Sequence, residues 1–560
     1  MVCSKLFSGD LPELMNEVVQ YFRYDHKTLH SCILVNRLWC HLAIPLLWED
    51  PFSIKDPKNY HFIEIYLHYY LNDDDKTKLN EYVIHNELFP SNALFNYPSF
   101  IQHLCSFKVC CSIEKWITTV GTSTTSNEQH SKYFIRKTSL QIPIFTKLIC
   151  KLLFLIFIEN EAKLHSFEVT LIRKIEIDYF NETFELILQN PNFIHNIKNF
   201  KIDFAERTDD NIMDFLRNIY SNCKSISSLD FQFPSCNFNY SVIEKSLSQL
   251  IKSQENLQKI LFGYNDSPLY HSLLSLKYSD CSNTLNTIIF YYVDFRNIVV
   301  LNEVFNQLNV LESIHIVCCY SLDYNFMQQI SNVTRPFKLK SLFLHETLQI
   351  ESLKLLIQKS SNYLENFGIS FEITDNEVQQ LLPLIIKFSS KIKYLETTWL
   401  DNEGVYLLFS LIENITQNLN YLTIDCSHYS LSYYFSSIIL QNLGQILPFE
   451  LKYLNLSLMN NNTSNLEIFL KNLQNTFIKS LLIKDVIEKK ENEDIFPHIK
   501  EYIMKMKRVK YLAILENFDG IYEDLFIQKE KVKEFQLHGI KVLNYSDLVI
   551  NVYDFIKEVC

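Results

Sequence analysis

The side chains in this sequence that are best suited to metal binding or covalent chemistry are its 14 cysteines and 16 histidines. No two cysteines have the C-x-x-C spacing of a zinc ribbon or a redox site, and the adjacent pairs Cys110–Cys111 and Cys318–Cys319 suit no zinc finger. No H-E-x-x-H motif and no catalytic carboxylate pair stands out. We therefore expect no catalytic residue, no metal site and no cofactor, and we predict that the chain is not an enzyme.

The eight glycines are too dispersed to form a phosphate-binding loop, because no two of them lie within ten positions of each other. Such a loop needs clustered glycines so that the backbone can approach the anion. This spacing excludes Rossmann and P-loop nucleotide sites. It also excludes the G-x-S-x-G elbow that carries the nucleophile of many hydrolases.

The bulk composition limits the partners of the chain. With 52 basic and 64 acidic residues it carries a net charge of −12 and shows no basic stripe, so we expect no nucleic acid partner. The longest apolar run, near Leu148 to Ile158, is interrupted by Lys151 and is too short to span a membrane. The cysteine-rich sequence begins without a signal peptide pattern, so we expect a reduced protein of the cytoplasm, the nucleus or both.

The elements that must position partner-binding residues begin with a helical module at residues 1–50. Asp10 and Glu13 flank a proline in a typical helix-start pattern, and apolar residues then recur at helical spacing. A second helix follows Asp25, and a third carries Trp39 and is limited by Pro45. Three short helices within about 40 residues have a small core, so we expect the module to dock on something larger.

Residues 11–48 resemble an F-box, most closely those of fungal F-box proteins in which the module ends with Pro-Leu-Leu-Trp-Glu. The matching positions are Leu11, Pro12, Leu14, Val18, Phe22, Leu29, Val35, Arg37, Trp39, Ala43, Pro45, Leu47 and Trp48. Asn36 departs from the pattern, because many F-boxes have cysteine at this position.

The resemblance implies that the module binds the Skp adaptor of a Skp–cullin–F-box ubiquitin ligase, and through the adaptor a cullin. The adaptor-binding positions that it implies are Leu11, Pro12, Leu14, Val18, Leu29, Val35 and Trp39. Apolar anchors buried in a partner's groove are typical of interface hot spots. The alternative is that these residues form a small helical cap on the rest of the chain.

Residues 51–160 are predicted to be a mostly helical bridge from the module to the rest of the chain. Apolar periodicity indicates helices within 61–71, 112–116 and 145–158. Near residues 118–132 the sequence is polar and dense in serine and threonine, which predicts an exposed loop.

From residue 161 to residue 560 a short strand-like pattern recurs: apolar, polar, any residue, apolar, any residue, apolar. Its instances begin at Leu164, Ile197, Ile226, Leu257, Leu285, Leu311, Leu339, Leu364, Ile392, Leu419, Leu451, Ile478, Val509 and Val532. The mean interval is about 28 residues, which is the length of one strand–turn–helix unit. Because one such unit cannot bury its own apolar face, the units must stack.

Helix-start signals lie in the gaps between these predicted strands. Ser241 and Glu244, Thr374 and Glu377, and Ser464 and Glu467 each have the spacing of a capping box before an apolar run. The units resemble the irregular leucine-rich repeats of many F-box proteins. This resemblance predicts an α/β solenoid of about 14 repeats, a horseshoe with parallel strands on its concave face and helices on its convex face.

The residues between the buried strand anchors are predicted to point into the concavity. Tyr394, Tyr421, Tyr453 and Tyr511 share one register there, and His315 and Phe343 lie two steps further along their strands. Tyrosine provides a large rigid contact area with a polar tip, so this row is a candidate substrate-binding surface. The alternative is that tyrosine, with 32 copies in the chain, fills exposed strand positions by β-propensity.

Three functions remain open from the sequence. The preferred one is a non-catalytic receptor that binds the adaptor through its F-box and the protein to be ubiquitylated through its repeats. The second is a leucine-rich-repeat scaffold that binds proteins without a ubiquitin ligase. The third is an α-helical-repeat enzyme or regulator whose site is not visible in the sequence.

Overall fold

The computed structural model describes most of the 560 residues. The described residues are 12–54, 57, 60–80, 83–85, 92–122, 133–135, 142–204, 210–233, 240–265, 269–278, 280–296, 298–346, 349–370, 375–388, 390–398, 402–426, 432–459, 463–489, 496–504, 508–518 and 521–559. The chain forms two compact units. The amino-terminal unit comprises residues 1–260 and 271–285, and the carboxy-terminal unit comprises residues 261–270 and 286–560.

Three short helices open the amino-terminal unit: α2 (Pro12–Gln20), α3 (His26–Ile33) and α4 (Arg37–Leu47). The Asp25 carboxylate caps α3 by accepting the backbone N–H of Thr28 at 3.0 Å. The Asn36 side chain caps α4 in the same way, with the backbone N–H of Trp39 at 3.0 Å. Each cap satisfies an N–H group that the helix cannot pair internally.

The prediction that Pro45 limits the third helix is wrong, because Pro45 lies inside α4. A proline so close to the end of a helix removes one backbone hydrogen bond. The final turn still closes, since the Trp48 backbone N–H donates to the Ile44 carbonyl at 3.1 Å. Burial of Leu46 in the core of the three helices adds to its stability.

Over its described residues, the bridge contains four helices and two short strands that pair antiparallel. They are α5 (His61–Tyr70), α6 (Asp73–Asn80), α7 (Ser106–Thr122), α8 (Ile142–Glu159), β1 (Val83–His85) and β3 (Tyr133–Ile135). The helices predicted at 61–71, 112–116 and 145–158 are thus present. The loop predicted near 118–132 is wrong for residues 118–122, which continue α7. The threonine hydroxyls there donate to carbonyls one turn back in the helix, so they do not break it. Residues 123–132 lie outside the described residues.

Four strands and four helices complete the amino-terminal unit. They are β2 (His103–Cys105), β4 (Ser166–Leu171), α9 (Lys174–Gln189), β5 (Asn199–Phe204), α10 (Asp210–Asn222), β6 (Ser228–Gln232), α11 (Tyr240–Lys252) and α12 (Tyr270–Tyr278). Neighbouring strands pair in parallel. The first residues of β4, β5 and β6 lie opposite one another, namely Ser166, Asn199 and Ser228. β2 is a strand that the repeat pattern did not predict.

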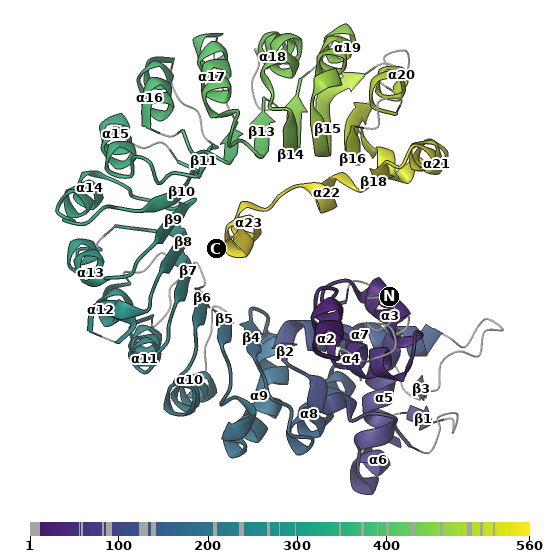
Figure 1. The fold of residues 1–560 in the computed structure, drawn as a ribbon. Helices are drawn as coiled ribbons and strands as arrows, with labels where there is room; N and C mark the ends of the chain where they lie inside the picture. The colour runs from purple at the N-terminus through teal and green to yellow at the C-terminus, as the bar shows by residue number, and fades with distance from the viewer. Residues whose placement is uncertain are drawn as a thin grey trace. The chain divides into compact units, whose positions relative to one another are not determined.

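The carboxy-terminal unit continues the alternation after β7 (Lys259–Asn265). Its elements up to the last repeat are β8 (Thr287–Val293), α13 (Leu301–Gln307), β9 (Ser313–Val317), α14 (Tyr324–Ser331), β10 (Leu339–Leu344), α15 (Ile350–Lys359), β11 (Asn366–Ile369), α16 (Asp375–Phe388), β12 (Tyr394–Thr397), α17 (Asn402–Ile415), β13 (Tyr421–Asp425), α18 (Ser432–Ile446), β14 (Glu450–Leu458), α19 (Thr463–Asn472), β15 (Phe477–Lys489), α20 (Phe496–Ile499) and β16 (Val509–Phe518). In Figure 1 the helices α13 to α19 lie on one side of these strands.

The strands follow chain order along a sheet of 16 strands, with β2 beside β4 at one end. At the other end, β17 (Ile521–Asp524) pairs antiparallel with β16, and β18 (Lys541–Val542) pairs with β16 in parallel. Apart from β17, every pairing recorded in this sheet is parallel. The fold is therefore an α/β solenoid-like arrangement in which each repeat adds one strand and one helix.

The strand predictions from Leu164 to Val509 are confirmed, because each predicted start lies within two residues of the first residue of one of the strands β4 to β16. The last one is wrong, because Val532 lies in helix α21 (Lys529–Leu537). Its lysines and glutamates are good helix formers. Gly539, with a φ of +76°, supplies the left-handed turn that follows the helix.

Two of the predicted capping boxes are wrong, because α11 and α19 begin one residue before Ser241 and Ser464 and so contain them. The Glu244 carboxylate instead accepts the backbone N–H groups of His271 and Ser272, at 2.6 and 3.3 Å, at the start of the helix of the next repeat. Thr374 lies outside the described residues, although α16 begins directly after it.

After α21 the chain ends in a segment that belongs to no repeat, which we call the tail (residues 541–559). It consists of β18, α22 (Tyr545–Leu548) and α23 (Val552–Val559). Figure 1 shows the tail in yellow on the strand side of the carboxy-terminal unit, the side opposite the helices of the repeats.

Candidate partner-binding surfaces

The helical module has a core of its own and an apolar surface outside it. Its core consists of Met15, Val19, Leu29, Cys32, Trp39, Ala43 and Leu46. Leu14, Leu34 and Val35 remain 47%, 78% and 53% exposed. Large apolar side chains on a surface favour contact with another protein, because that contact removes them from water.

The residues predicted to bind the adaptor fall into three groups. Leu14 and Val35 are exposed and Val18 is half-buried, so these three are accessible to a partner. Leu29 and Trp39 are buried in the core of the module, so we now assign them to supporting its surface instead of contacting a partner. Leu11 lies outside the described residues. Pro12 opens α2, and its side chain also lies outside the description.

The end of the module is fixed to the bridge. The Glu49 carboxylate forms an ion pair with Arg23 at 3.2 Å. The backbone carbonyl of Glu49 accepts hydrogen bonds from the N–H groups of Gln102 and His103 at 3.0 and 3.1 Å. Burial raises the pKa of Glu49, and the nearby Arg23 acts in the opposite direction. The Trp48 ring packs on the bridge as well, with its centroid 5.3 Å from that of Tyr66. These contacts hold the exposed apolar set on a folded support.

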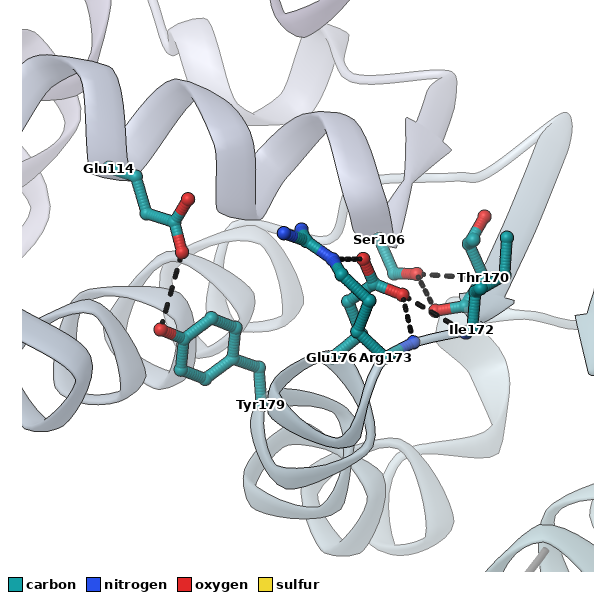
Figure 2. Close-up of polar contacts among 7 residues, drawn as sticks. All are labelled: Ser106, Glu114, Thr170, Ile172, Arg173, Glu176 and Tyr179. Atoms are coloured by element: carbon teal, nitrogen blue, oxygen red, sulfur yellow. Dashed lines mark hydrogen bonds and ion pairs between the residues drawn. The ribbon is translucent and has the colours of Figure 1, made fainter. Parts of the chain in front are cut away.

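A buried junction ties the bridge to the first repeat, as Figure 2 shows. The Glu176 carboxylate accepts the backbone N–H groups of Ile172 and Arg173 at 3.0 and 2.9 Å and pairs with the Arg173 guanidinium at 2.6 Å. The Ser106 hydroxyl, from α7, accepts the backbone N–H of Thr170 at 2.9 Å. Because each of these groups already has a protein partner, the junction is a structural support and does not resemble a reaction site.

The predicted tyrosine row is present in the carboxy-terminal unit. Strand register places Tyr394 opposite Tyr421, Tyr421 opposite Tyr453, and Ser480 between Tyr453 and Tyr511. This part of the prediction is confirmed, since it depends only on the periodicity of the strands.

The tyrosine row is covered, contrary to the open surface that the repeat pattern predicts. Tyr394 and Tyr453 are only 1% and 3% exposed, and Tyr421 and Tyr511 are half-buried. Ring centroids of Phe555, from the tail, lie 5.0 Å from Tyr394 and 4.9 Å from Tyr421.

The other two predicted substrate contacts are buried too. His315 is 1% exposed, and its Nδ1 lies 2.7 Å from the Ser341 hydroxyl. Phe343 is 3% exposed and packs against Tyr394, with ring centroids 5.4 Å apart. Neither side chain is available to a partner while the tail is in place.

Carboxylates on this strand face are in an environment that disfavours their charge. Burial raises the pKa of Glu396, the nearby Asp425 acts in the same direction, and a hydrogen bond from the Tyr394 hydroxyl at 3.0 Å opposes both. The strand face is thus mainly apolar and aromatic, with polar groups that are paired within it.

A polar cluster occupies the strand face of the amino-terminal unit. The Lys201 ammonium pairs with the Glu168 carboxylate at 2.5 Å, and Asp203 and Asp230 lie nearby on β5 and β6. Burial raises the pKa of Asp203 to about 6, although Lys201 lowers it. Lys201 lies among three carboxylates, so its ammonium group offsets only part of their negative charge.

Within the described residues, no group of three or more histidine, cysteine, aspartate or glutamate side chains has the geometry to hold a metal ion. Over the same part of the chain, no helix combines the length and the apolar character needed to cross a membrane.

The tail is the element on the strand face of the carboxy-terminal unit that the sequence did not predict. Its last helix does carry a signal, because Val552, Phe555, Ile556 and Val559 have the i, i+3, i+4, i+7 spacing of an amphipathic helix. That spacing identifies a helix with one apolar face and gives no information about the surface on which it packs.

Neither protein-family models nor curated proteins match this chain. The function must therefore be argued from the surfaces described above.

Proposed function

We propose that this protein is the substrate receptor of a Skp–cullin–F-box ubiquitin ligase, with the helical module binding the Skp adaptor and the repeats binding the protein to be ubiquitylated. One observation carries the proposal: the module keeps a closed core while leaving Leu14, Leu34 and Val35 exposed. A module that served only as a cap would bury such residues on its own chain. The resemblance to F-boxes supplies the identity of the partner.

The proposed role needs no reaction site. A receptor increases the rate of modification by holding its cargo near the ligase, which raises the effective concentration of one for the other. Parallel-stranded repeat arrays suit this role, because stacking builds a long continuous surface from short units. The clusters at Glu176 and Lys201 are internally paired and leave the proposal unchanged.

Co-purification with the Skp adaptor tests the proposal. We expect the wild-type chain to retain the adaptor and the double variant Leu14→Ala, Val35→Ala to bind it on the order of 1,000-fold more weakly, since central anchors contribute about 2 kcal/mol each. The matched control is Ile172→Ala, which truncates an apolar side chain that is 57% exposed and lies outside the module. It should retain the adaptor.

Two results would count against the proposal. Undiminished adaptor binding by the double variant would refute the assigned anchors. Absence of adaptor binding by the wild-type chain would favour the alternative function, a repeat scaffold that binds proteins without a ubiquitin ligase.

A further inference from the structure

The helix α23 lies on the strand face of the carboxy-terminal unit through one apolar side. Ile556 is 1% exposed and belongs to a buried cluster with Leu261, Ile289, Tyr291, Val317, Phe343 and Tyr394. Beside it, the ring of Tyr553 packs on Tyr291 with centroids 4.5 Å apart. Asp554, on the other side of the helix, is exposed, and Val559, at the end of the apolar face, remains 57% exposed.

The tail is anchored more firmly at its beginning than at its end. Lys541 and Val542 pair with β16 as a strand, and Tyr545 is fixed by two hydrogen bonds. Its backbone N–H donates to the Asp524 carboxylate at 2.7 Å, and its hydroxyl donates to Asn455 Oδ1 at 2.8 Å. Further on, the backbone N–H of Ile550 donates to the Tyr453 hydroxyl at 3.2 Å. α23 itself is held by packing of Val552, Tyr553, Phe555 and Ile556.

Helix α23 is suited to detach from the strand face. With eight residues, α23 is too short to be stable without the surface on which it packs. Elements with few buried contacts open at a lower free-energy cost than the sheet beneath them. Once α23 leaves, the apolar cluster around Phe343 and Tyr394 faces water, which favours its coverage by another apolar segment.

We propose that α23 is a displaceable occupant of this strand face, and that the face binds an amphipathic helix of a partner protein whose apolar residues have the spacing of Val552, Tyr553, Phe555 and Ile556. The chemistry of the partner follows from that of α23. The partner needs one aliphatic residue in place of Ile556 in the buried cluster, and neighbouring aromatic rings to contact Tyr291, Tyr394 and Tyr421. Helix-in-groove recognition uses such anchors. The proposal does not depend on adaptor binding by the helical module.

A peptide with the sequence of residues 545–559 tests this inference in the full-length chain. The variant Ile556→Ser should weaken α23 on the strand face, and the matched control is Val559→Ser, which changes an apolar residue at the end of the same helix that is 57% exposed. By fluorescence anisotropy we expect the labelled peptide to bind the Ile556→Ser chain at least tenfold more tightly than the wild-type chain or the control. Adding Tyr394→Ala to Ile556→Ser should reverse the gain, because it removes the ring that Phe555 contacts.

Two results would overturn the inference. One is an Ile556→Ser chain that keeps its circular dichroism and binds the peptide no better than wild type. The other is an Ile556→Ser chain that loses its cooperative thermal transition, because α23 would then be an integral part of the fold. Hydrogen exchange of the wild-type chain gives an independent measurement: the amides of α23 should exchange at least tenfold faster than those of β13, and equal protection would also contradict displacement.

Discussion

At the scale of single residues, burial decides which polar side chains are accessible. The polar side chains of Glu176 and Tyr545 form hydrogen bonds inside the chain. The apolar side chains of Leu14 and Val35, in contrast, are exposed to solvent. The most informative titratable group is Asp203, on the strand face of the amino-terminal unit. The positively charged Lys201 on the same strand does not compensate the loss of hydration that raises the pKa of Asp203 to about 6.

Asp203→Asn should make the protein more stable at neutral pH. Because the folded-state pKa of Asp203, about 6, exceeds its ordinary value of 3.8, the folded chain binds this proton more tightly than the unfolded chain. Stability from this group is therefore present below pH 4 and is lost as the pH rises to about 6. After allowance for partial exposure, we expect a gain of about 1 kcal/mol at pH 7 in urea unfolding.

The control for this prediction is Asp214→Asn, which changes an exposed aspartate on α10 that pairs with Arg217. It should alter the free energy of unfolding little, since exposed ion pairs contribute little to stability. An Asp203→Asn chain whose stability is lower than wild type at pH 7 would show that the Lys201 interaction outweighs burial.

At the scale of elements, the sequence predicts what depends on local periodicity. Thirteen strand starts, β4 to β16, follow from an alternation of apolar residues that each strand carries in itself. The capping box predicted at Glu244 is wrong, because the Glu244 carboxylate accepts a hydrogen bond from the helix of the next repeat and not from the start of α11. The position of the tail could not be predicted for the same reason, because it depends on contacts between residues far apart in the sequence. Ile550 and Tyr453, for example, are 97 positions apart.

The close packing beneath the tail gives a prediction for β11. Strand register places Gly368 opposite Phe343 and Glu396, and a Cβ atom at residue 368 would lie 2.3 Å from Phe343 Cδ1. Gly368→Ala should therefore displace the Phe343 ring and lower the free energy of unfolding by about 1–3 kcal/mol. Thermal unfolding measures the loss. Hydrogen exchange of α23 should also become faster, because Phe343 belongs to the cluster that holds Ile556.

A Gly368→Ala chain as stable as wild type, with unchanged protection of α23, would contradict this account of the strand face. The position differs from Gly539, where φ is +76° and no atom lies within 4 Å of an added Cβ. There the cost of a substitution would come from the backbone and not from crowding.

At the scale of the whole molecule, the sequence predicts the repeat fold better than the surface that is open to a partner. The strand–helix repeats that the apolar periodicity predicts are present. The predicted substrate surface could not be assessed from sequence, because Tyr394 and Phe343 are covered by a segment about 150 or more positions later.

In cells, the proposed receptor function predicts that the amount of substrate protein found near the chain depends on proteasome activity. Proximity labelling from the wild-type chain should enrich its substrate several-fold more when the proteasome is inhibited, because ubiquitylated cargo is then not degraded. The Leu14→Ala, Val35→Ala chain should label the same protein without that dependence, since it lacks the adaptor but keeps the repeats. Labelling that is equal for both chains with and without inhibitor would favour a scaffold.

The anchoring of the tail determines which partners can displace α23. Because β18 and Tyr545 stay attached, α23 acts as a tethered ligand whose local concentration is on the order of millimolar. A free helix with equal intrinsic affinity, present at micromolar concentration, would be outcompeted by about a thousandfold. The tether thus sets an affinity threshold, and only a partner that exceeds it, or that is itself held nearby, takes the place of α23.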